Sequence, residues 1–576
     1  MKPLLIILIF SFTQANSEIP DDFTTVFEQS KGTETATYEQ VIDYYNNLAE
    51  QYPQITIQSK GMTDSGKPLH IVTYNKDGKF KFSDTDRNKS RLLINNGIHP
   101  GESDGIDATM MLFRDLATEK ITTPKNTIIV TIPIYNIGGS LNRNSTSRTN
   151  QNGPKEYGFR GNARNYDLNR DFIKNDTENA KSFAEIFHLV QPDVFIDNHV
   201  SNGADYQYVL THLFTQHNKM GGDLGKYINQ SMRPKLEKKL EQKNWDITPY
   251  VNVFNSVPEK GFKQFMDYPR YSTGYTTLFN TIGMMVETHM LKPYKQRVEG
   301  TYELMASIIE IIDKDSNSIK KMRSNSHTKI YAQEKYTLNW EVDTDKDSLL
   351  NFKGYEGNMI DSKVTNAQRL KYDRTKPFTK PTKYQNYFKP TVQITIPKAY
   401  VIPEGWHNVI DLLQLNNVKM KQLDSDRIYN VESYEIVEFD TRQSPYEGHY
   451  LHSKTQIKTS QIKQAFKQGD YLINTNQEAI RYLLETLEPQ GPDSFFNWNF
   501  FDTILQQKEG FSPYVFEEIA EGLLNNNPKL MDEFNQKLEN DSEFKENWYA
   551  QLSWIHKNSE YYEKAYKKYP VYRILK

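Results

Sequence analysis

The sequence predicts an α/β protein with a mixed, largely parallel central sheet flanked by helices, followed by a β-rich and then a helical C-terminal region. Two observations carry this prediction. Short apolar segments typical of buried strands alternate with longer segments of helical periodicity, and the pattern changes to short alternating segments after residue 330. Strands that alternate with helices usually pair in parallel, because each helix returns the chain to the same end of the sheet.

The predicted helices and strands follow one another along the first half of the chain. Apolar residues have helical spacing over 38–51, 104–119, 177–190, 225–240 and 297–313. Strand-like segments are 69–74, 91–96, 127–135, 193–197 and 284–287. In such a sheet the carboxyl ends of parallel strands meet at one edge, which is where reactive groups usually gather.

The first 17 residues are typical of a secretory signal peptide. Lys2 precedes the apolar run 4–10, and polar and small residues follow at 13–17. A charged start, a short apolar stretch and small residues before a cleavage point mark exported proteins, and the run is too short to span a bilayer. We therefore expect residues 1–17 to be removed and the mature protein to be exported, without a membrane anchor.

Composition narrows the class of protein. The chain has 70 Lys and Arg against 73 Asp and Glu, a net charge of −3, whereas a general nucleic-acid binder would carry a basic excess. It contains no cysteine, so neither disulfides nor a lipid-modified N-terminal cysteine can form. An exported protein without cysteine fits a bacterial periplasm or exterior better than a eukaryotic secretory route.

The chain is too long for one ordinary domain, since 576 residues exceed the roughly 100–200 residues that most domains contain. We expect an α/β domain over residues 18–315. A polar segment rich in helix breakers predicts a linker over 316–330. In the C-terminal region, 331–576, short alternating segments predict strands over 336–440, and residues from 459 onward have a helical pattern.

Three polar residues have the identities and positions of zinc ligands. His99 and Glu102 stand three residues apart just after the strand predicted at 91–96, and His199 follows the strand predicted at 193–197. Catalytic zinc prefers three protein ligands with nitrogen and oxygen donors and leaves one position for water. The alternative is that each histidine is an ordinary packed or exposed residue.

Two further groups would complete a hydrolytic site. Glu287 ends the apolar run 284–286, and a carboxylate beside a zinc-bound water can act as general base. Asn169 and Arg170 offer an amide and a planar guanidinium, which together suit a carboxylate. The structural alternatives are a salt-bridged glutamate and an arginine that staples a loop.

Together these motifs resemble the zinc carboxypeptidase family, the carboxypeptidase A-like metallopeptidases. The matching elements, in that family's order, are His99-Pro100-Gly101-Glu102, Asp167-Leu168-Asn169-Arg170, His199 and Glu287. The resemblance covers residues 35–315, and four ordered motifs are far more specific than any one of them. It implies an enzyme with one zinc ion per chain that hydrolyses the C-terminal amide bond of peptides.

The resemblance implies a role for each matching residue. The zinc ligands are His99, Glu102 and His199, the general base is Glu287, and Asn169 and Arg170 hold the terminal carboxylate of the substrate. The expected substrate is a peptide, including a cell-wall peptide. Two rival functions are a zinc deacylase of N-acyl amino acids and a non-catalytic module that binds peptide C-termini.

Two other family roles have less certain matches in this sequence. An arginine that stabilises the oxyanion is expected at Arg148, with Arg143 as the alternative. A tyrosine that closes over the substrate is expected at Tyr271, with Tyr275 as the alternative. Gly101 departs from the best-known members, which have arginine directly before the ligand glutamate, so the subsite served by that arginine is expected to differ.

Overall fold

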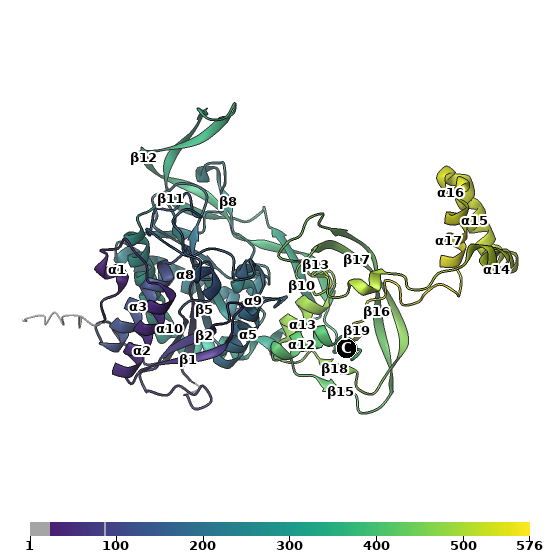
Figure 1. Cartoon of the computed structure of the whole chain (residues 1–576), viewed down its shortest axis with the longest axis horizontal. Helices are drawn as coiled ribbons and strands as arrows, with labels where there is room; N and C mark the ends of the chain where they lie inside the picture. Colours follow the sequence, from purple (N-terminus) through teal and green to yellow (C-terminus); the bar gives the residue numbers. More distant parts are fainter. Residues whose placement is uncertain (1–22, 86–87) are drawn as a thin grey trace, which may run out of the picture. The chain divides into compact units, whose positions relative to one another are not determined.

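The structure is a computed structural model that describes residues 23–85 and 88–576 (Figure 1). The expected signal peptide lies outside these residues. The chain forms two compact units. The first ends at Thr395 and also takes in Leu412–Val418 and Asn476–Leu484, and the second comprises Ile396–Asp411, Lys419–Thr475 and Glu485–Lys576.

An eight-stranded sheet forms the centre of the first unit. Its strands, in spatial order, are β1 (Ile55–Met62), β2 (Pro68–Tyr74), β4 (Thr127–Ile132), β3 (Ser90–Asn95), β5 (Val194–Ser201), β9 (Ile282–His289), β6 (Leu210–Phe214) and β7 (Ile247–Pro249). The four central strands β4, β3, β5 and β9 are parallel, whereas the antiparallel pairs lie toward the edges. The predicted mixed, largely parallel sheet is therefore confirmed.

Helices cover both faces of this sheet (Figure 1). Successive side chains of a strand point to opposite faces, and β5 has buried residues on both. Phe195 points to one face, where its ring centroid lies 6.0 Å from that of Phe183. Asn198 points to the other, where its side-chain amide lies 3.6 Å from the sulfur of Met305. The helices on the first face are α5 (Glu178–Val190) and α9 (Ser272–Thr277), and those on the second are α3 (Asp104–Ala117) and α10 (Tyr294–Ser324).

The first unit continues into β-structure beyond the α/β sheet. A hairpin of β11 (Ser348–Asp361) and β12 (Gln368–Gln385) is joined by β8 (Phe262–Lys263), and β10 (Lys335–Val342) pairs with β13 (Phe388–Thr395). The other helices up to Thr395 are α1 (Val26–Gln29), α2 (Tyr38–Gln51), α4 (Ile137–Leu141), α6 (His217–Met220), α7 (Gly222–Tyr227), α8 (Arg233–Gln242) and α11 (Ser326–Tyr331), with short helical turns at Leu168–Arg170, Ile228–Met232 and Pro258–Lys260.

The second unit contains a six-stranded sheet followed by helices, which confirms the predicted β-rich and helical C-terminal region. The strands are β15 (Lys421–Gln422), β18 (Tyr471–Asn474), β14 (Ala399–Ile402), β19 (Tyr572–Ile574), β16 (Arg427–Thr441) and β17 (His452–Phe466) in spatial order. The helices from residue 407 onward are α12 (His407–Leu415), α13 (Ile480–Leu487), α14 (Pro513–Asn526), α15 (Pro528–Asn540), α16 (Ser542–Glu546) and α17 (Trp548–Lys557), with a helical turn at Asp502–Leu505.

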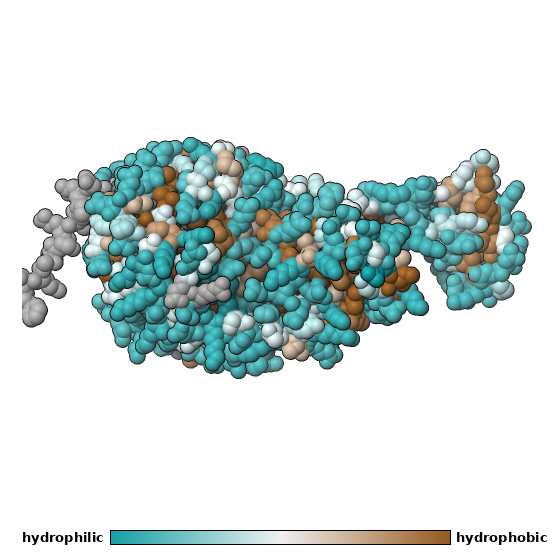
Figure 2. All heavy atoms as spheres, turned by 90° about the horizontal axis from the view of Figure 1, so that it is seen from below, coloured by the Kyte–Doolittle hydropathy of each residue, from teal (hydrophilic) through white to brown (hydrophobic). Residues whose placement is uncertain are grey.

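The last four helices have a small core of their own, which includes Phe516, Phe534 and Leu552. Figure 2 shows apolar side chains at the surface of this helical segment. Two aromatic residues of these helices, Tyr514 and Trp548, are exposed. Across residues 23–85 and 88–576, no helix combines the length and apolar character needed to cross a membrane.

Two segments differ from the sequence expectation. Residues 316–330, expected to be a linker, lie in the end of α10 and in α11, because their few apolar residues face the core. Ile319 is fully buried, and Ser316 Oγ lies 2.9 Å from Ser90 Oγ at the start of β3. Residues 459–466 and 471–474, expected to be helical, are strands, because they pair along β16 and β14.

The end of α10 should therefore stabilise the first unit. Replacing Ile319 with alanine would remove buried methyl groups and leave a cavity, so we expect the free energy of unfolding to fall by about 2–5 kcal/mol. Lys321→Ala changes an exposed residue two positions on and should alter it by less than about 0.5 kcal/mol. Urea unfolding measures both, and equal stability of the two variants would restore the linker interpretation.

Candidate metal centre and substrate pocket

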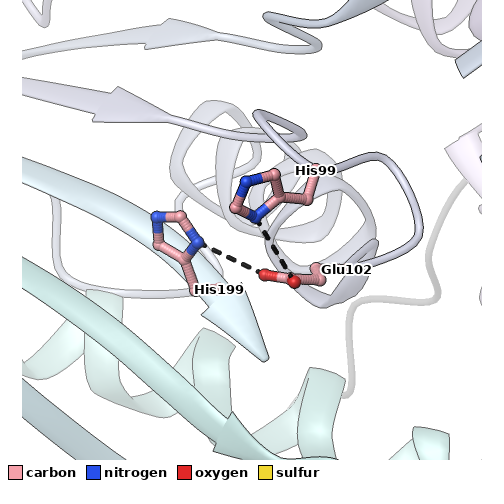
Figure 3. A group of neighbouring side chains, drawn as sticks. All are labelled: His99, Glu102 and His199. Atoms are coloured by element: carbon pink, nitrogen blue, oxygen red, sulfur yellow. Dashed lines mark hydrogen bonds and ion pairs between the residues drawn. The ribbon is translucent and has the colours of Figure 1, made fainter. Parts of the chain in front are cut away.

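Three buried side chains meet at the carboxyl ends of neighbouring parallel strands. His99 and Glu102 lie in the connection from β3 to α3, and His199 lies near the end of β5. The Nδ1 atoms of His99 and His199 lie 3.3 Å and 3.2 Å from the two oxygens of the Glu102 carboxylate. Figure 3 shows both rings turning Nδ1 toward that carboxylate. The three residues are 3–4% exposed, and one donor atom of each lies within 4.8 Å of the others.

A carboxylate other than Glu102 contacts the Nε2 atom of each histidine and holds its ring in place. Asp167 Oδ1 lies 2.9 Å from His99 Nε2, and Asp197 Oδ2 lies 2.8 Å from His199 Nε2. A carboxylate that accepts the Nε2 proton sets the tautomer of the ring and leaves Nδ1 as the free donor atom. Both rings are therefore oriented as metal ligands, with Nδ1 facing the same point.

The residues fit a zinc ion. His99 Nδ1 is buried and makes no hydrogen bond within the described part of the chain, so it keeps a lone pair for a metal. Burial alone would raise the pKa of Glu102, but Arg148 and His99 hold that pKa well below its ordinary value. Two imidazole nitrogens and one ionised carboxylate are the donor set of a catalytic zinc site.

Glu287 stands beside this group because β5 and β9 are paired in parallel. It is the register partner of His199 in that pairing, and it lines the same pocket. Desolvation raises the pKa of Glu287 to about 7, with Glu102 and Asp197 acting in the same direction and His199 opposing them. A carboxylate whose pKa lies near neutrality can both accept and return a proton.

The pocket has a volume of about 610 Å³ and brings the other expected residues together. Asn169 and Arg170 line it from the helical turn Leu168–Arg170. The Arg170 guanidinium lies 4.6 Å from the centre of the Tyr271 ring, a distance that favours a cation–π contact. Asn169 Oδ1 accepts a hydrogen bond of 3.2 Å from the Ser272 amide at the start of α9.

Comparison with known proteins relates this part of the chain to a known family. Residues 41–192 match a family model described as zinc carboxypeptidase. This part of the chain is therefore similar to the zinc carboxypeptidase family. The matched residues include His99, Glu102, Asn169 and Arg170, whereas His199 and Glu287 lie beyond them and are joined to the site by the fold.

The curated proteins that this chain resembles are distant in sequence. Carboxypeptidase 2 of Trichophyton rubrum is 22% identical over 71% of this chain and 73% of its own length. Carboxypeptidase 2 of Trichophyton equinum is 20% identical over 81% and 84%. A solved metallo-carboxypeptidase from Burkholderia cenocepacia aligns with a TM-score of 0.36 at 16% identity, over 48% of this chain and 70% of that chain.

The structure separates the two arginine candidates. Arg148 lines the pocket, and its guanidinium donates a hydrogen bond of 2.9 Å to Glu102. Arg143 is not among the pocket-lining residues, and its guanidinium lies 3.2 Å from the Glu156 carbonyl. Gly101 leaves space for this position of Arg148, because a Cβ atom at residue 101 would lie 2.5 Å from Arg148 Cδ and the side chain would have to shift. The departure at position 101 therefore makes room for Arg148.

The tyrosine candidates are separated in the same way. Tyr271 lines the pocket next to Arg170. Tyr275 is fully buried, and its hydroxyl donates a hydrogen bond of 2.7 Å to Asn416. A side chain fixed in the core cannot reach a substrate, which leaves Tyr271 as the candidate.

Sequence reasoning assigned no role to Arg160, Asp167 and Asp197, although Asp167 belongs to a matched motif. Arg160 lines the pocket, with its guanidinium 2.8 Å from Asp167 and 3.7 Å from Glu102. The two aspartates stand two residues before Asn169 and two before His199, so proximity to the motifs was a usable signal for them. No local signal marks Arg160, which only the folding of its loop brings to the pocket.

Asp197 should strengthen metal binding without being a ligand. Asp197→Asn keeps the shape of the side chain but removes the charge behind His199, and we expect the affinity for zinc to fall about 10- to 100-fold. Asp223→Asn changes a half-exposed carboxylate outside the pocket and should leave the affinity unchanged. Competition with a chromogenic chelator measures both constants, and equal affinities would show that Asp197 only packs.

Proposed function

We propose that the protein is an exported zinc carboxypeptidase that removes the C-terminal residue of peptides, with Glu287 as general base. The observation that carries this proposal is the placement of Asn169 and Arg170 in the same pocket as the metal ligands and Glu287. An amide and a guanidinium suit a free carboxylate. A substrate held there by its terminal carboxylate would present its last amide bond to the metal.

Each pocket residue would then have a defined task. When bound, the ion supplies Lewis acidity for the scissile carbonyl and for the attacking water. The Glu287 carboxylate takes a proton from that water and passes it to the nitrogen of the departing residue. Asn169 and Arg170 fix the orientation of the substrate, which makes the attack effectively unimolecular. Tyr271 packs over Arg170 and shields the bound carboxylate.

Two arginines stand ready to stabilise the charge that develops on the scissile carbonyl oxygen. Arg148 and Arg160 both line the pocket and both approach Glu102. Donors that are already oriented toward a developing oxyanion lower the barrier because they need no rearrangement during the reaction. We assign this role to Arg148, with Arg160 as a second donor that sequence reasoning did not include.

The proposed place of action is outside the cytoplasm of a bacterium, in the periplasm or beyond. The apolar run 4–10 between Lys2 and the polar residues 13–17 supports export. Peptides, including those of a cell wall, are the substrates proposed there.

Glu287 tests the proposal directly. We expect Glu287→Gln to retain one zinc per chain and to lose about 10²- to 10⁴-fold in kcat on a peptide with a free C-terminus, because the amide cannot take a proton. Glu241→Gln, which changes an exposed glutamate, should behave like the unmodified protein. Metal analysis and a ninhydrin assay of the released amino acid give both readouts. Near-normal turnover by Glu287→Gln would remove the general base from the proposal.

The same assay separates the rival functions. Faster turnover of N-acyl amino acids than of peptides would favour a deacylase, and peptide binding without cleavage by the unmodified protein would favour a binding module. Four groups arranged around a metal site, His99, Glu102, His199 and Glu287, argue for an enzyme, because a module that only binds peptide C-termini needs none of them together.

Arg170 tests the selection of C-terminal residues. Arg170→Gln removes a charged donor to the terminal carboxylate, so we expect kcat/KM for a free-acid peptide to fall about 10- to 100-fold. Arg164→Gln alters an arginine outside the pocket lining and should have little effect. With an amidated peptide, the unmodified protein should already be slow and Arg170→Gln no slower. Equal rates on free-acid and amidated peptides would contradict a carboxypeptidase.

A further inference from the structure

Three pocket-lining segments adjoin residues that contact the β11–β12 hairpin. The segments are residues 201–202, residues 250–254 and Met290, which we call the outer wall of the pocket. The hairpin itself supplies none of the pocket-lining residues. It therefore influences the pocket through the outer wall.

Backbone pairing attaches the loop that follows the first segment to the hairpin. The loop after β5 forms an antiparallel bridge from Tyr206 to Gly354 of β11. The Gln207 amide donates a hydrogen bond of 3.1 Å to the Lys353 carbonyl. The Gln207 side chain donates two more, each of 2.9 Å, to the carbonyls of Gly354 and Phe378. One glutamine thus ties the loop to both strands of the hairpin.

An apolar cluster attaches the second segment. Val251 and Val253 are buried together with Tyr206 against Phe352 of β11 and Tyr384 of β12. Above this cluster the Tyr372 hydroxyl donates a hydrogen bond of 2.8 Å to the Ser256 carbonyl. The residues that carry Tyr250, Asn252 and Phe254 into the pocket are therefore backed by hairpin side chains.

A series of polar contacts attaches the third segment to the hairpin. Arg374 of β12 donates a hydrogen bond of 2.7 Å from Nε to Asp205, whose other oxygen lies 3.2 Å from His289 Nε2. His289 ends β9 directly before Met290, and its ring stacks on Tyr206 at 4.2 Å. Burial would raise the pKa of Asp205, but the hydrogen bonds from His289 and Arg374 outweigh it and lower that pKa.

Arg374 is the exposed end of this series of polar contacts. Its side chain is 54% exposed, whereas Asp205 and His289 are almost completely buried. Losing the guanidinium would leave one oxygen of a buried carboxylate without its charged partner, and such a carboxylate would pull away from His289 toward water. Glu287 would keep its place, because β9 is paired on both sides, with β5 and with β6.

We propose that Arg374 is a positioning residue, which sets substrate affinity by holding the outer wall through Asp205 and His289. The hairpin, which lies outside the α/β sheet, is thus part of the construction of the pocket. The effect on substrate rests on the proposed carboxypeptidase function, whereas the effect on the wall does not.

Kinetics of Arg374→Gln test the effect on substrate. We expect KM for a free-acid peptide to rise about three- to tenfold while kcat stays within about twofold, because the wall moves and the reacting groups do not. Arg374→Lys keeps a charge for Asp205 and should bring KM back to within about twofold of the unmodified value. Arg369→Gln changes an exposed arginine of the same strand and is the matched control. An unchanged KM, or a loss of kcat alone, would overturn the proposal.

Hydrogen–deuterium exchange tests the wall independently of any activity. The amides of Gln207 and His289 are hydrogen-bonded to the Lys353 and Val209 carbonyls. Peptides that cover residues 201–209 and 287–292 should exchange faster in Arg374→Gln than in Arg369→Gln. The melting temperatures of the two variants should be nearly equal. Equal exchange overturns the proposal even if the protein proves inactive on peptides. Inactivity of the unmodified protein together with faster exchange would instead refute only the proposed function.

Discussion

The parallel pairing of β3, β5 and β9 is the constraint on which the site depends. Parallel strands end at the same edge of a sheet, so residues far apart in the sequence meet there without long loops. The register of β5 on β9 places His199 directly beside Glu287, a candidate metal ligand beside the candidate general base. A shift of one residue would turn one of these side chains to the opposite face of the sheet. The spacing of metal ligand and base is thus set by backbone hydrogen bonds.

Electrostatic balance explains why this edge of the sheet needs a cation. Glu102, Asp167 and Asp197 are carboxylates with little or no exposure, and Glu287 adds a fourth. Buried charges are stable only when they are paired. Arg148 and Arg160 neutralise part of the excess, and a metal bound between the two Nδ1 atoms and Glu102 would neutralise more of it. The arginines therefore stabilise the ligand set in addition to the role proposed for them toward substrate.

Sequence reasoning reached the parts of the site that have a local signature. His99 and Glu102 share one short motif, and His199 and Glu287 end recognisable strands, so the fold class and the metal group could be predicted. Arg160 and the separation of Arg148 from Arg143 could not, because they depend on how irregular loops fold over the sheet. The helical structure of residues 316–330 could not be predicted either. Most of these residues are polar because they form the solvent-exposed face of a helix, and the one face that packs inward includes the buried Ile319.

The domain boundary suggested by composition at residue 315 conflicts with the packing of the first unit. Ending the fold there would expose Val251, Val253 and Tyr206, whose partners Phe352 and Tyr384 come from the hairpin. It would also leave Asp205 without Arg374. The compact unit extends to Thr395 for this reason. A wall that is backed by residues outside the α/β sheet can change without disturbing the candidate metal ligands, which allows substrate affinity and catalytic chemistry to vary separately on one sheet.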